Sequence, residues 1–206
     1  MIFYTLAQKG RHMKKAIIIH GINKSKEFAA EHQLPVTAWH WLGWLQQKFN
    51  IADVNCQNVL FPHSWFNDKK YEDDSEVFSQ FRVDEDTRLI AWSAGTSFIL
   101  RWLYEHPELK AKHLVLMSPH LNMNKILPNN YFDGQIPMDL LERFERVDML
   151  YSTNDPIPGV VESAEKMMEL FPTMNVIKFD DRAHFQAPDE GIMEFPELWE
   201  VCETMI

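Results

Sequence analysis

Residues 89–95 read LIAWSAG, an apolar run that meets a helix-like run at a serine flanked by small residues. A strand that turns sharply into a helix at such a serine lifts the hydroxyl clear of the backbone. The flanking residues must be small because this turn is strained and crowded. The segment predicts a nucleophilic serine at Ser93, provided that the chain also supplies a base, an orienting acid and oxyanion donors.

The runs on either side of this segment predict alternating strands and helices. Residues 16–21 are β-branched and end in glycine, which is typical of a strand buried on both faces of a parallel sheet. Strands are predicted at residues 16–21, 54–61, 87–92, 113–117, 147–152 and 175–179. Helices are predicted at residues 37–49, 76–81, 95–105, 138–144, 160–171 and 195–206. This alternation predicts an α/β fold with a doubly wound, mostly parallel six-stranded sheet flanked by helices.

Length and composition limit the classes of protein that fit. The 206 residues suit one α/β domain, expected at residues 13–206, with residues 1–12 as an N-terminal extension. A net charge of −10 argues against nucleic acid or an anionic membrane as a partner. The two cysteines form no CxxC pair and no apolar run reaches the ~18 residues of a membrane span, so we expect a cytoplasmic protein.

Two further polar residues follow predicted strands in the way that Ser93 does. Asp155 comes just after the fifth strand and His184 just after the sixth. The carboxyl ends of parallel strands share one edge of the sheet, so the three side chains are expected to meet there. Histidine suits the role of general base, and a buried carboxylate fixes the tautomer of the imidazole. The order serine, acid, histidine is that of the α/β-hydrolase fold.

Oxyanion donors are expected from two backbone segments. One donor is the Ala94 amide, directly after the serine. The other comes from the loop after the first strand, where Gly21 turns the chain and Ile22 is the favoured amide; which amide of this loop completes the hole stays open. Candidate pocket residues, chosen from their loop positions, are His20, Gly21, Asn23, Trp65, Phe66, Tyr131 and Phe185.

Other polar residues carry weaker predictions. Ser118 also follows a strand, but Pro119 leaves no amide for an oxyanion, so this segment is interpreted as a structural loop. His20 is predicted either to line the pocket or to have a purely structural role. The charged run at residues 69–74 predicts a solvated turn. The histidines show no metal-binding spacing and no phosphate-binding glycine motif is present, so neither metal nor cofactor is expected.

Several of these motifs together resemble a known family. The chain is similar to the small cap-less serine hydrolases of the retinoblastoma-binding protein 9 type and their bacterial relatives, within the α/β-hydrolase superfamily. The likeness covers most of residues 14–204, with Ala91 and Trp92 standing where glycine and histidine are usual. The motifs that carry it are residues 18–21, 41–45, 91–95, 114–118, 152–156 and 183–185.

This resemblance implies an α/β-hydrolase fold without a large cap domain, a Ser93–Asp155–His184 triad and no cofactor. The expected activity is carboxylesterase-like cleavage of small esters through an acyl-enzyme. Two alternatives stay open: a small-peptide or amide hydrolase of the aminopeptidase kind, and a hydrolase-fold binding module with little turnover. The partner expected is a small-molecule ester or amide, and the oligomeric state is open.

Overall fold

The computed structural model describes residues 13–22, 40–62, 69–127, 130–186 and 194–206. Within them, six strands form one sheet of order β2-β1-β3-β4-β5-β6, and every neighbouring pair is parallel. The strands are β1 (Lys15–Ile19), β2 (Asn55–Val59), β3 (Thr87–Trp92), β4 (Ala111–Met117), β5 (Phe144–Ser152) and β6 (Asn175–Phe179). The predicted parallel six-stranded sheet is confirmed. The expected extension at residues 1–12 lies outside the described residues.

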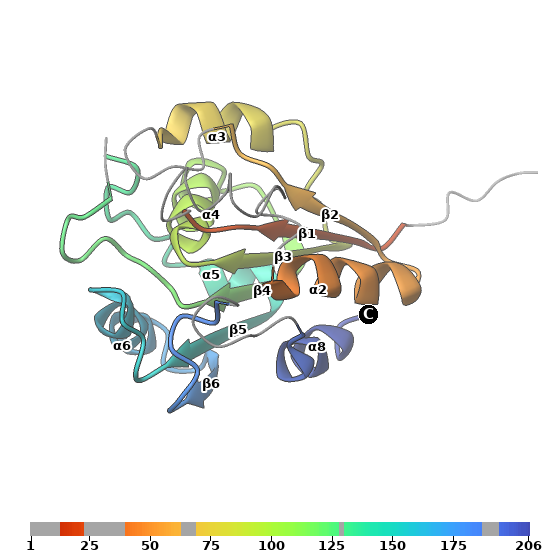
Figure 1. Ribbon diagram of the computed structural model, residues 1–206. Coiled ribbons are helices and arrows are strands. Elements are labelled where there is room, and N and C mark those ends of the chain that lie inside the picture. The colour runs from red at the N-terminus through yellow and green to blue at the C-terminus, as the bar shows by residue number, and fades with distance from the viewer. Residues whose placement is uncertain (1–12, 23–39, 63–68, 128–129, 187–193) are drawn as a thin grey trace, which may run out of the picture.

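Helices cover both faces of the sheet (Figure 1). One face carries α2 (His40–Ile51) and α8 (Pro196–Glu203), which lie side by side. The other face carries α3 (Tyr71–Phe78), α4 (Ala94–Glu105), α5 (Leu140–Arg143) and α6 (Val160–Leu170). Among the described helices, none combines the length and apolar character needed to cross a bilayer.

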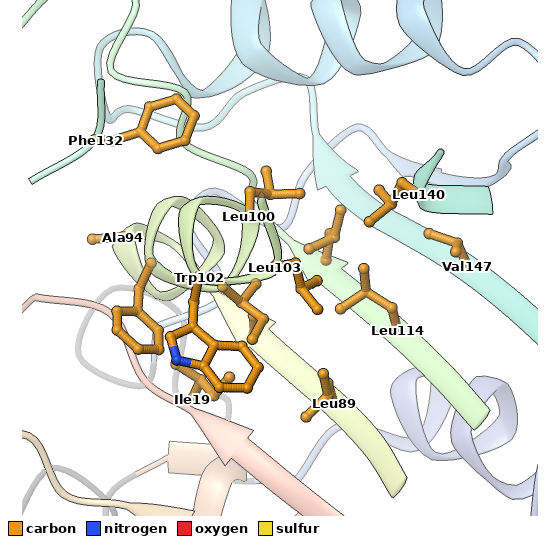
Figure 2. Close-up of a cluster of buried hydrophobic side chains, with 14 of the residues drawn as sticks. Ile19, Leu89, Ala94, Leu100, Trp102, Leu103, Leu114, Phe132, Leu140 and Val147 are labelled. Carbon is orange, nitrogen blue, oxygen red and sulfur yellow. The ribbon is translucent and has the colours of Figure 1, made fainter. Parts of the chain in front are cut away.

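Strand β3 shows how a continuous apolar run serves two cores. Successive side chains of a strand point to opposite faces. Leu89 and Ala91 therefore belong to the core under α4, whereas Ile90 and Trp92 belong to the core under α2 and α8. In Figure 2, Leu100 and Leu103 of α4 lie between the helix and the sheet. This burial on both faces explains why the run lacks polar alternation.

The prediction of a solvated turn at residues 69–74, with a helix beginning near residue 76, was wrong. Helix α3 begins at Tyr71, and it buries Tyr71, Asp74 and Phe78 on one side. Lys69 Nζ lies 2.6 Å from Asp74 Oδ2, and both side chains are buried. The Tyr131 hydroxyl donates to the same carboxylate oxygen at 2.6 Å. A charged run can thus lie inside when its charges pair with each other.

The chain reverses its direction of travel across the sheet between β1 and β3. It moves from β1 outward to β2, then returns to place β3 on the other side of β1. In open parallel sheets, ligands bind beyond the carboxyl ends of the strands at such a switch point. Ser93 follows β3 and the loop at Gly21 follows β1, so both predicted features stand at this position.

Candidate active site

Ser93 stands between the last residue of β3 and the first residue of α4. Its backbone has φ 56° and ψ −127°, a conformation that residues with a side chain rarely adopt. The Ser93 amide donates to the Met117 carbonyl at 2.9 Å, so the β3–β4 ladder continues up to the turn. The strand, the strained residue and the helix together have the geometry of a nucleophilic elbow.

Two glycines let the end of β1 pass close to this elbow. A Cβ at Gly21 would lie 2.7 Å from Ser93 Cβ, and one at Gly95 would lie 2.6 Å from the Ile19 carbonyl oxygen. Side chains do not approach other atoms so closely, so only glycine fits at either position. The absence of side chains brings the backbone after β1 beside the Ser93 hydroxyl.

The three side chains predicted to carry the chemistry form one hydrogen-bonded chain. His184 Nε2 lies 2.9 Å from Ser93 Oγ, and His184 Nδ1 lies 2.7 Å from Asp155 Oδ2. The imidazole and the carboxylate are both buried. Because an ionised carboxylate can only accept, the proton of a neutral His184 lies on Nδ1, which leaves Nε2 to accept the serine proton.

Asp155 is held by two further donors. Its Oδ2 atom accepts a hydrogen bond from Ser118 Oγ at 2.9 Å, and its Oδ1 atom accepts one from the Ile157 amide at 2.9 Å. With His184 Nδ1, the carboxylate has three partners in fixed directions. Such a network restrains the carboxylate to one orientation relative to the imidazole.

Two buried indoles hold the loop that carries His184. Ala183 and Phe185, on either side of it, have φ values of 39° and 56°, so the loop backbone needs outside support. Trp92 Nε1 donates to the His184 carbonyl at 3.1 Å, and Trp41 Nε1 donates to the Phe185 carbonyl at 3.0 Å. Sequence patterning indicates only that these tryptophans are buried. A buried indole N–H requires a hydrogen-bond acceptor, and this requirement was the signal in the sequence that the two tryptophans bind another segment.

His20 ties the loop after β1 to the residues after β2. Its Nδ1 lies 2.6 Å from the Gly21 carbonyl oxygen, and its Nε2 accepts from the Phe61 amide at 3.3 Å. Only a neutral ring makes both bonds, and burial together with nearby Lys69 lowers the His20 pKa to about 3. In a trans peptide the C=O and N–H groups point in opposite directions, so this bond turns the Ile22 amide away from His20.

A cavity of about 270 Å³ opens beside Ser93. Apart from Ser93, His120, His184 and Gln186, its described walls are apolar. The described lining residues are Ile22, Ser93, Ala94, His120, Ile126, Leu127, Ile157, Pro158, His184 and Gln186. The two residues whose amides were predicted to bind the oxyanion, Ile22 and Ala94, both line this cavity.

The candidate pocket residues chosen from loop position do not line the cavity where the structure describes them. Tyr131 and Phe185 were expected at the wall, and this was wrong: both rings are fully buried in the two hydrophobic cores. Large aromatic rings in loops next to a sheet gain by packing inward. His20 and Gly21 stand behind the wall, where they shape the loop after β1. The candidates outside the described residues are Asn23, Trp65 and Phe66.

His120 lines the cavity and was not among the predicted site residues. It follows β4 by three positions, so the strand-end rule that selected Asp155 and His184 could also have found it. Its Nδ1 accepts from the Asn122 amide at 3.1 Å. Burial and the neighbouring His184 lower the His120 pKa to about 4, so this ring is neutral near pH 7.

A larger depression, of about 610 Å³, lies at the opposite edge of the sheet. Its lining comes from residues 82–86, which precede β3, and residues 108–110, which precede β4. Ligands of parallel sheets bind beyond the carboxyl ends, so the smaller cavity beside Ser93 is the candidate active site. Within the described part of the chain, no group of three or more His, Cys, Asp or Glu side chains could hold a metal ion.

Solved structures share this architecture over nearly the whole chain. The ydeN gene product from B. subtilis is 21% identical with a TM-score of 0.76, covering 93% of this chain and 98% of its own. A protein of unknown function from Agrobacterium tumefaciens, provisionally described as an α/β hydrolase, is 13% identical with a TM-score of 0.57, covering 95% of this chain and 85% of its own. This chain has the α/β-hydrolase fold.

The α/β-hydrolase fold of this chain also resembles that of an esterase from Rhodococcus sp. That structure is 14% identical with a TM-score of 0.55, covering 94% of this chain and 91% of its own. The sequence matches no protein-family model and no curated protein. The expected α/β-hydrolase fold is therefore confirmed by structure.

Proposed function

We propose that this protein is a serine hydrolase that cleaves small esters through an acyl-enzyme. The observation that carries the proposal is the hydrogen-bonded chain from Ser93 through His184 to Asp155, which ends beside an apolar cavity. Solved structures of the same fold include an esterase from Rhodococcus sp. and a structure described with the carboxylesterases of Nitrososphaera gargenis. These neighbours support the proposed chemistry.

In the first half-reaction, Ser93 Oγ attacks the ester carbonyl carbon while His184 Nε2 takes the hydroxyl proton. Asp155 accepts a hydrogen bond from Nδ1 and stabilises the imidazolium that forms. The imidazolium then protonates the leaving oxygen, the ester C–O bond breaks, and the acyl group remains on Ser93. In the second half-reaction, His184 removes a proton from water, the water oxygen attacks the acyl carbon, and Ser93 regains its proton as the acid leaves.

The negative oxygen of each tetrahedral intermediate needs donors that are already in place. The Ala94 amide is one of the first N–H groups of α4, which have no partner within the helix. The Ile22 amide is the second donor, because the bond between His20 and the Gly21 carbonyl turns it away from His20. Each donor of this kind contributes about 3 kcal/mol to lowering the barrier in comparable enzymes.

The cavity walls favour an uncharged, apolar acyl or alcohol group. Ile126, Leu127, Ile157 and Pro158 line the cavity beside Ser93. Pockets of this composition bind apolar groups and use their few polar atoms to orient the ligand. An ester of a short fatty acid fits this chemistry.

The test is a panel of p-nitrophenyl esters, from acetyl to decanoyl, beside aminoacyl p-nitroanilides. We expect ester hydrolysis that depends on Ser93, with kcat/KM rising along the series until the acyl chain fills the cavity and then falling. Faster cleavage of the aminoacyl anilides would replace the proposal with an aminopeptidase-like activity. A folded wild-type protein that cleaves neither class would contradict it in favour of a binding module.

A further inference from the structure

Ser118 contacts the same carboxylate oxygen as the proposed base. It directly follows β4 and is fully buried. Its Oγ donates to Asp155 Oδ2 at 2.9 Å, and His184 Nδ1 lies 2.7 Å from that same oxygen. One carboxylate oxygen thus serves two donors at once.

The backbone of Ser118 is held firmly in the conformation that directs this hydroxyl. Its φ is 41°, in the left-handed region that residues with a side chain seldom occupy. Its amide donates to the Leu150 carbonyl at 2.8 Å, so the pairing of β4 with β5 extends to this residue. Pro119 follows and restricts the backbone further. Strain of this kind persists only where the surroundings determine the conformation.

Ser118 is not placed to act as a second nucleophile. His184 Nε2 faces Ser93 Oγ, so the accepting nitrogen is aimed at the other serine. The hydroxyl proton of Ser118 is directed at Asp155. The residue after it is Pro119, which has no amide to bind an oxyanion as Ala94 does. Its hydrogen bonds lead to the Asp155 carboxylate and to the Leu150 carbonyl of the sheet.

We propose that Ser118 is a positioning residue, whose hydroxyl holds the Asp155 carboxylate in line with His184 and weakens that carboxylate as a partner for the imidazolium. This role rests on the proposed function. Two donors on Oδ2 share its negative charge. Without the hydroxyl, more of that charge acts on Nδ1, so the imidazolium keeps its proton to higher pH. The carboxylate also gains freedom to rotate, so fewer molecules are aligned for reaction.

Other charged and titratable groups near this pair are limited in the described residues. His120, from the loop after β4, interacts with both His184 and Asp155 and has a pKa of about 4. The stretch 180–182, from the loop after β6, contributes two exposed aspartates and a half-buried arginine. A change in the acidic limb of the pH–rate profile near neutral pH therefore reports on the Asp155–His184 pair.

The experiment measures the second-order rate of inactivation by a fluorophosphonate as a function of pH, which needs no known substrate. Ser118→Ala and Ser118→Gly both remove the hydroxyl, and glycine also relieves the positive φ. Ser163→Ala is the matched control, because the buried Ser163 hydroxyl also joins the loops after β4 and β5, through Leu121 and Gly159, without touching Asp155.

We expect both Ser118 variants to move the acidic limb upward by about 0.5 pH unit and to lower the plateau rate about 3- to 10-fold, the effect of losing one hydrogen bond. Ser163→Ala should leave the limb in place. An unchanged limb in either folded Ser118 variant, or an equal shift in Ser163→Ala, would overturn the positioning role and leave the proposed function standing. A folded wild-type protein that is not inactivated would overturn both.

Discussion

We expect the His184→Ala variant to lose about 10⁵- to 10⁶-fold in kcat on a p-nitrophenyl ester while it keeps its fold. His184 Nε2 lies 2.9 Å from Ser93 Oγ, and without it the hydroxyl has no base within reach. His120 also lines the cavity, but its Nδ1 is already occupied by the Asn122 amide. The Asp155→Ala variant should lose less, about 10⁴-fold, because the base itself remains.

The measurement is steady-state turnover per folded molecule, with circular dichroism as the test of folding. The matched control is His113→Ala, because His113 forms a second buried pair, with its Nε2 2.6 Å from Asp148 Oδ2 within the sheet. This control should lose stability and keep kcat/KM within about twofold of wild type, since surface and core changes away from the site act mainly on folding. Turnover above one-tenth of wild type in His184→Ala would remove that residue from the mechanism.

We expect Gly95→Ala to destabilise the fold by about 2–3 kcal/mol. A Cβ there would lie 2.6 Å from the Ile19 carbonyl oxygen and 2.7 Å from the His20 carbonyl oxygen. Both are backbone atoms that cannot rotate aside, so α4 must move away from β1. The substitution would otherwise stabilise the helix by up to about 1 kcal/mol, so a net loss isolates the crowding.

For a chain of this length, such a loss lowers Tm by about 5–10 °C, which differential scanning calorimetry measures. Gly134→Ala is the comparison, because Gly134 has φ +84° but a Cβ added to it would meet no other atom within 4 Å. It should cost about 1–2 kcal/mol from backbone conformation alone. A Gly95→Ala protein with the Tm of wild type would show that β1 and α4 are not packed as described.

Local sequence patterns located two of the described strands to the residue, although β3 is buried throughout and β6 is largely exposed. The predicted ranges at residues 87–92 and 175–179 coincide with β3 and β6. The start of β5 was placed three residues late, at residue 147, and its first residue, Phe144, was assigned to the preceding helix. The Arg143 guanidinium, at the last residue of α5, donates to three backbone carbonyls from the end of α4 and the loop beyond it. A contact between segments so distant in the chain leaves no trace in a local pattern.

The site shows the same division between what strand topology determines and what side-chain packing determines. Parallel strands bring residues after β3, β5 and β6 to one edge, and Ser93, Asp155 and His184 are joined there. Periodicity shows only that Trp41 and Trp92 are buried, and it cannot identify the carbonyls that their indoles meet. The pocket wall depends on how each loop side chain packs, which is why aromatic content was a poor guide to it.

The proposed function requires that Ser93 carries the activated hydroxyl. The most direct measurement is peptide mapping by mass spectrometry after reaction with a fluorophosphonate, in which the serine oxygen displaces fluoride from phosphorus. We predict one adduct per chain on the peptide that contains Ser93, and none in Ser93→Ala. An adduct on Ser118, or a folded wild-type protein that stays unlabelled, would contradict the claim.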